Sequence, residues 1–67
     1  MIQAMSTGQR FEIFEDKAGE WRWRLVAANG NIIADSGEGY SSKQGAKRGI
    51  QSVKRGAADA AVEVLED

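Results

Sequence analysis

The stretch RFEIFEDKAGEWRWRLVAANGNIIADS, residues 10–36, decides the fold, because it holds three strand-like runs separated by two turn signals. The runs are Arg10–Glu15, Glu20–Ala27 and Asn31–Ser36. Alternation of side chains with a period of two, clearest in the second run, is typical of strands with one buried face. Asn29-Gly30 is a strong signal for a tight hairpin turn. The sequence therefore predicts three antiparallel strands joined by short turns.

The turns predict how the strands pair. A two-residue type I′ turn at Asn29-Gly30 needs a positive φ at both positions. It predicts the pairs Ala28–Asn31, Ala27–Ile32, Val26–Ile33, Leu25–Ala34 and Arg24–Asp35. A three-residue loop at 17–19, with Gly19 in the left-handed region, predicts the pairs Asp16–Glu20, Phe14–Arg22, Ile13–Trp23, Glu12–Arg24 and Phe11–Leu25. A shift of one residue in the first hairpin would set Phe11 and Ile13 against the arginines, so this register is favoured.

These registers give the sheet one mainly apolar face and one mixed face. The apolar face gathers Phe11, Ile13, Trp21, Trp23, Leu25, Ala27, Ile32 and Ala34. The mixed face gathers Phe14, Val26 and Ile33 together with Glu12, Arg24 and Asp35. We expect a helix to pack on the apolar face alone, which leaves the mixed face to solvent or to a partner.

The second half of the chain predicts that helix, over residues 42–55. Ser41 followed by Gln44 fits a capping box at its start, and Gly56 fits a C-cap. The apolar stripe is Ala46, Gly49, Ile50 and Val53, and Gly49 permits a close approach to the sheet. Ala61–Leu65 is interpreted as a short final strand. The expected architecture is α+β, a β-β-β-α-β unit with one helix on one face of an antiparallel sheet, formed by a single domain over 10–67 after a flexible leader at 1–9.

Composition limits the classes of function. The chain has 67 residues, a net charge of −1, no Cys and no His, so it lacks disulfides and the usual zinc ligands. Small chains without such supports often oligomerise. No apolar run reaches the roughly 20 residues of a membrane-spanning helix, and the first ten residues lack the features of a secretory signal. We expect a cytoplasmic protein with no cofactor, no metal and no membrane partner.

Several blocks of the chain resemble the YegP-like family of small uncharacterised bacterial and archaeal proteins. The blocks are Phe11–Leu25, Ala28–Gly30, Gly39–Lys43 and Gly49–Val53, and together they span about Arg10 to Lys54. In that family the β-β-β-α-β unit is used twice, and the two units form one continuous sheet and exchange their final strands. The resemblance therefore implies a homodimer of this chain in which Ala61, Val62, Glu63, Val64 and Leu65 contact the partner copy. It implies no established activity and no catalytic residues.

The predicted helix carries a basic face formed by Lys47, Arg48, Gln51, Lys54 and Arg55, with Gln44 beside them. Clustered Lys and Arg bind phosphate backbones, so this face is a candidate anion or nucleic-acid site. The favoured interpretation is a solvated face that balances the acidic sheet and tail, in which Lys54 and Arg55 suit the helix C-terminus.

Other candidate sites have structural interpretations. Trp21 and Trp23 alternate with arginines, a pattern seen in base-stacking platforms, but the register places both in the core. The row Glu12–Arg24–Asp35 is interpreted as a cross-strand ladder rather than an anion site. Residues 37–39, Gly-Glu-Gly, lack the spacing and the Lys of a phosphate-binding loop, so a hinge or turn is expected. The carboxylate pairs at 15–16 and 66–67 lie in no evident pocket.

The absence of His and Cys and the small size argue against an enzyme. The favoured interpretation is a non-enzymatic homodimeric module that acts through protein contacts. The alternative is a nucleic-acid-binding dimer that uses the basic helix faces. A third possibility is a small ligand bound in the cleft between the two copies.

Overall fold

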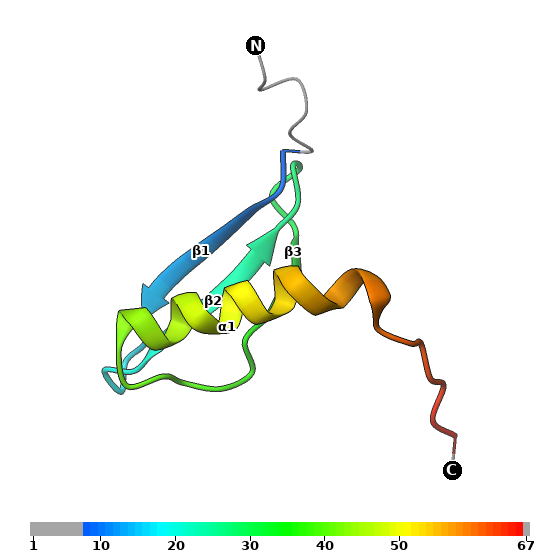
Figure 1. Cartoon of the computed structure of the whole chain (residues 1–67). Helices are drawn as coiled ribbons and strands as arrows, with labels where there is room; N and C mark the ends of the chain where they lie inside the picture. The colour runs from blue at the N-terminus through cyan, green and yellow to red at the C-terminus, as the bar shows by residue number, and fades with distance from the viewer. Residues whose placement is uncertain (1–7, 67) are drawn as a thin grey trace.

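The computed structural model describes residues 8–66 and has a three-stranded sheet with one helix across one face (Figure 1). The sheet is antiparallel in the order β1-β2-β3. The elements in chain order are β1 Arg10–Glu15, β2 Trp21–Val26, β3 Ile32–Asp35, α1 Lys43–Gly56 and a 3₁₀ turn η2 Ala57–Asp59. The expected α+β class, sheet and helix are confirmed, and the second and third strands are each one residue shorter at both ends than predicted.

The first hairpin has the predicted register along its whole length. β1 pairs with β2 through Phe11–Leu25, Glu12–Arg24, Ile13–Trp23 and Phe14–Arg22. The loop at 17–19 is closed by hydrogen bonds from Asp16 N to Glu20 O at 2.8 Å and from Gly19 N to Asp16 O at 3.0 Å. Gly19 has a φ of +84°, the left-handed position that such three-residue loops place at their end.

The second hairpin differs from the prediction, because its turn is not the two-residue type I′. Gly30 has a φ of +93°, whereas Asn29 does not have a positive φ. Ala27 N donates to Asn31 O at 2.7 Å and Gly30 N donates to Ala27 O at 2.9 Å. The loop is therefore Ala28-Asn29-Gly30, the same arrangement as in the first hairpin. It needs one left-handed residue instead of two, and glycine supplies it.

This longer loop changes the pairing of β3. Arg24–Asp35 and Leu25–Ala34 are paired as predicted. Val26 pairs with Ile32 rather than with Ile33, and the register shifts between Leu25 and Val26. The predicted pairs Val26–Ile33, Ala27–Ile32 and Ala28–Asn31 are therefore wrong, since Ile33 is the extra residue of a bulge on β3.

The core lies between α1 and the first two strands. Trp23, Ala46 and Ile50 are buried, and the partly buried residues packed against them are Phe11, Ile13, Trp21, Tyr40 and Val53. The rings of Phe11 and Trp23 meet edge to face with centroids 5.5 Å apart. The predicted helix stripe and the core position of the two tryptophans are confirmed. Ile32 and Ala34 were expected in the core but are exposed, because α1 packs on β1 and β2 and not on β3.

The boundaries of α1 differ from the prediction in two respects. Ser42, not Ser41, is the N-cap, and its hydroxyl accepts a hydrogen bond from Gly45 N at 3.0 Å. The helix continues through Gly56, whose φ is −113°, into η2. Gly56 therefore does not end the helix in a left-handed conformation, and Ala57–Asp59 follow it as a 3₁₀ turn.

The predicted strand Ala61–Leu65 is not formed within the single chain. Residues 60–66 have no helical or strand structure, and this segment leads away from the sheet in Figure 1. Among the described residues the sheet has no fourth strand, so β1 and β3 are its two edges. The predicted leader at 1–9 lies outside the described residues except for Gly8 and Gln9.

Candidate interaction surfaces

The sheet face opposite α1 carries a row of ion pairs. Glu12 lies between two arginines: its Oε1 accepts from Arg24 Nε and its Oε2 from Arg10 Nε, each at 2.8 Å. The hydrogen bond from Arg24, and next that from Arg10, lowers the pKa of the Glu12 carboxyl. The guanidinium of Arg24 also lies 4.7 Å from the centre of the Phe14 ring. Arg24 is thus engaged by both of its neighbours on β1.

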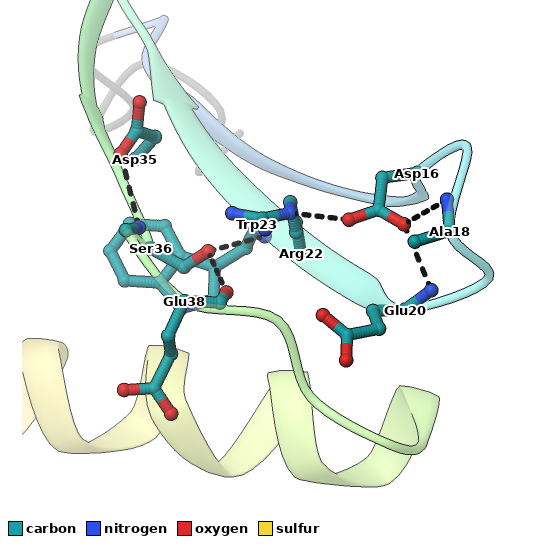
Figure 2. A network of polar contacts seen from close by, with 9 residues as sticks. Asp16, Ala18, Glu20, Arg22, Trp23, Asp35, Ser36 and Glu38 are labelled. Atoms are coloured by element: carbon teal, nitrogen blue, oxygen red, sulfur yellow. Dashed lines mark hydrogen bonds and ion pairs between the residues drawn. The ribbon is translucent and has the colours of Figure 1, made fainter.

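The predicted ladder Glu12–Arg24–Asp35 is only half formed. Asp35 stands opposite Arg24 in the backbone register. Its carboxylate instead accepts a hydrogen bond from Gly37 N at 3.1 Å, as Figure 2 shows. The Glu12–Arg24 pair fixes β1 against β2, whereas Asp35 stabilises the turn that follows β3.

A second ion pair ties the first turn to the same face of the sheet (Figure 2). Asp16 Oδ2 accepts from Arg22 Nε at 2.6 Å, and Asp16 Oδ1 accepts from the backbone N–H groups of Ala18 and Glu20 at 2.9 Å. The Arg22 hydrogen bond is the largest cause that lowers the pKa of the Asp16 carboxyl, followed by the one from Glu20 N. The same pair raises the pKa of Arg22. Both oxygens of the Asp16 carboxylate therefore stabilise the fold.

The segment after β3 is a hydrogen-bonded turn. Ser36 N donates to Trp23 O at 2.9 Å, and the Ser36 hydroxyl donates to Glu38 O at 2.9 Å. Gly37 has a φ of +71°. The chain then returns to β2, where Tyr40 and Trp21 exchange two backbone hydrogen bonds of 2.7 and 2.8 Å. Residues 37–39 therefore form a turn, as the sequence predicts, and not a phosphate-binding loop.

Tyr40 joins the sheet to the helix. Its backbone extends the pairing of β2, and its ring lies against Gly49 on α1. A Cβ at Gly49 would lie 2.9 Å from Tyr40 Cζ and 3.1 Å from Trp23 Nε1. Gly49 thus permits the close approach that the sequence predicts, although the approaching groups are two aromatic side chains. Trp23 Nε1 is buried without a hydrogen-bond partner in the described residues.

The structure brings the predicted basic residues together on one exposed helix. Lys47, Arg48, Gln51, Lys54 and Arg55 are all exposed on α1, and Lys54 and Arg55 occupy its last turn. The described ion pairs involve Arg10, Arg22 and Arg24 of the sheet, and none involves these helix residues. The helix also presents Lys43, whose Nζ lies 5.2 Å from the ring centre of Trp21.

The C-terminal segment is the most exposed apolar part of the described chain. Val62, Val64 and Leu65 are 91%, 76% and 87% exposed, and Ile32 and Ile33 of β3 are 60% and 51% exposed. The five predicted dimer-contact residues, 61–65, are all exposed in the single chain. Their contact with a second copy stays a prediction.

Other classes of site find no support among residues 8–66. The described residues form no pocket and no group of three or more potential metal ligands. No helix in the described range is long and apolar enough to span a membrane. The expected ligand in a cleft between two copies requires the dimer and stays a prediction.

Comparison with known proteins finds a family without an assigned activity. Residues 16–63 match the family model described as "Domain of unknown function (DUF1508)". A "UPF0339 protein" of Methanosarcina acetivorans is 51% identical over 57 residues, which cover 85% of this chain and 97% of that protein. Another "UPF0339 protein", of Treponema denticola, is 53% identical over 53 residues, covering 79% of this chain and 90% of the relative.

A solved structure shows the same fold. The solution structure of a protein from Haloferax volcanii is 63% identical in sequence, with a TM-score of 0.82, over 85% of this chain and 95% of that one. These relatives are small bacterial and archaeal proteins without a known role, as the resemblance to the YegP-like family predicts.

Proposed function

Because the chain belongs to the DUF1508 family of uncharacterised proteins, we propose that it works as a non-enzymatic homodimeric module that acts through protein contacts. The observation that carries this proposal is the C-terminal segment 61–65. It carries three large apolar side chains, Val62, Val64 and Leu65, that are 91%, 76% and 87% exposed. Exposure of such residues in a small domain is unfavourable unless a partner covers them.

The sheet supplies a matching surface. Strand β3 is an edge with unpaired backbone groups, and its Ile32 and Ile33 are more than half exposed. An unpaired apolar edge is a template for another strand. We expect segment 61–65 of one copy to pair with β3 of the other, so that the backbone hydrogen bonds and the apolar side chains of both are satisfied at once.

The size of the domain supports the same conclusion. Four residues of the described chain, Trp23, Val26, Ala46 and Ile50, form its buried apolar set. A core this small gives a thin margin of stability to a monomer. Two exchanged strands would extend the buried apolar surface without any change in the first 60 residues.

The experiment is a pair of single substitutions read by solution mass. Val64→Asp places a charge in the middle of the proposed contact, and we expect it to shift the protein from dimer to monomer. Ala60→Asp adds the same charge just before the segment, and we expect the dimer to persist. A dimer of unchanged affinity with Val64→Asp would contradict the role of this segment.

A further inference from the structure

The exposed side of α1 is a continuous polar stripe. Lys47, Gln51 and Lys54 follow one another at spacings of four and three residues, and Arg48 and Arg55 lie beside them seven residues apart. Residues at these spacings share one side of a helix. Lys47 and Lys54 are separated by about 10 Å along the axis at 1.5 Å per residue. The four cations thus form two short parallel rows.

These cations form no ion pair with any residue among 8–66. The charged groups of the described ion pairs are Arg10, Glu12, Asp16, Arg22 and Arg24, all of them in β1, β2 or the turn between them. No acid occurs between Lys43 and Gly56. Helix surfaces that serve only solubility commonly alternate the two signs at i, i+4 spacing. Helix α1 has positive charge alone.

The helix dipole explains only part of this pattern. Lys54 and Arg55 are in the last turn, where cations interact favourably with the helix C-terminus. Lys47 and Arg48 begin the second turn of a 14-residue helix, far outside the range of that effect. The helix dipole therefore does not explain the positive charge of Lys47 and Arg48. These two residues lie on the same stripe as Lys54 and Arg55.

A regular polyanion fits this surface. Arg presents a planar fork that binds phosphate oxygens in pairs, Lys supplies a point charge, and the Gln51 amide donates hydrogen bonds. We propose that the outer face of α1, formed by Lys47, Arg48, Gln51, Lys54 and Arg55, binds the phosphate backbone of nucleic acid without regard to base sequence. The proposal does not depend on the homodimer, because each copy carries the whole face.

The test is titration of the full chain into a fluorescent DNA duplex of about 20 base pairs, followed by anisotropy. Four phosphate contacts per helix predict a slope of log affinity against log salt of about −3.6, which is a loss of roughly 100-fold between 50 and 200 mM salt. Two helices bound to one duplex double the slope, and solution mass measured on the same samples identifies that case.

A charge-matched pair of variants locates the surface. The double variant K47Q/R48Q lowers the net charge by two and keeps residues of good helix propensity. Lys17→Glu also lowers the net charge by two, at an exposed residue in the turn before β2. We expect K47Q/R48Q to weaken binding at least tenfold and to reduce the magnitude of the salt slope by about 1.8, while Lys17→Glu changes binding little.

Three results would overturn the proposal. The first is no binding of the duplex at 50 mM salt. The second is an equal loss of affinity in the two variants, because that result indicates long-range charge and not a surface. The third is displacement of the duplex by polyglutamate as effectively as by unlabelled DNA, because the face then recognises acidic protein rather than phosphate.

Discussion

Gly49 on α1 leaves the space into which the ring of Tyr40 fits. A Cβ at this position would lie 2.9 Å from Tyr40 Cζ and closer still to the Tyr40 hydroxyl. Backbone pairing with Trp21 holds Tyr40 in place, so the ring has little freedom to move away. The packing of α1 on the sheet therefore depends on the absence of a side chain at Gly49.

Gly49→Ala should destabilise the protein. Alanine improves helix propensity by about 1 kcal/mol, but overpacking against Tyr40 and Trp23 costs about 1–3 kcal/mol. Gly56→Ala is the control, because nothing lies within 4 Å of its Cβ. We expect urea denaturation to show a lower midpoint for Gly49→Ala and an equal or higher one for Gly56→Ala. The account fails if Gly49→Ala is the more stable of the two.

Tyr40→Phe should partly rescue Gly49→Ala. Removing the hydroxyl removes the atom that the new methyl group meets most closely. Residues in direct contact show coupling of about 0.5–3 kcal/mol in double-mutant cycles. We expect the double variant to be more stable than the sum of the two single effects allows, as measured by urea midpoints. Strict additivity would show that the two side chains do not meet.

Acid should weaken the fold through Glu12 and Asp16. Ion pairs and hydrogen bonds lower the pKa of both carboxyls below their ordinary values of 4.5 and 3.8. A group with a lowered pKa in the folded state contributes stability above its unfolded pKa, and this contribution is lost as pH falls through the folded pKa. We expect urea midpoints to fall as pH drops below about 5.

The variants Glu12→Gln and Asp16→Asn isolate this effect. Asn at position 16 keeps an oxygen that can accept from Ala18 N and Glu20 N but loses the charge that pairs with Arg22. We expect the double variant to be less stable than the natural protein at pH 7 and to show a flatter dependence on pH. An identical acid dependence in both proteins would assign acid unfolding to other carboxyls.

The second turn should depend on Gly30 more than on Asn29. Gly30 has a φ of +93°, a conformation that costs a residue with a side chain about 1–2 kcal/mol. No atom lies within 4 Å of a Cβ built there, so the cost of Gly30→Ala is conformational. Asn29 does not have a positive φ, and Asn29→Asp keeps the oxygen that accepts from Asn31 N. We expect thermal unfolding to show a clear loss of stability for Gly30→Ala and little change for Asn29→Asp. An unchanged stability of Gly30→Ala would contradict the left-handed conformation of Gly30.

The accuracy of the sequence-based predictions followed the strength of the local constraint. In the first hairpin, a slip would have placed Phe11 and Ile13 on the wrong face, and the observed register matches the prediction. In the second hairpin both loop lengths keep Leu25 opposite Ala34, so the hydrophobic pattern did not distinguish them. The sign of φ at Asn29 is one difference between the two turns, and residue type alone does not determine it.

The sequence also predicts some of the candidate surfaces better than others. The basic stripe of α1 follows from helical spacing, so the sequence predicts it correctly as an exposed face. The role of Tyr40 depends on contacts with Trp21 and Gly49, which are far from one another in sequence. The segment 61–65 alternates like a strand, but a strand needs a neighbour, and this segment forms no strand in the described part of the single chain.

The most direct test of the central claim is the solution mass of the full chain, measured by size exclusion with light scattering at low and moderate salt. The proposed exchange of segment 61–65 predicts twice the 7.3 kDa of one chain at both salt concentrations, because apolar and backbone contacts resist screening. A particle of 7.3 kDa under both conditions would contradict the homodimer.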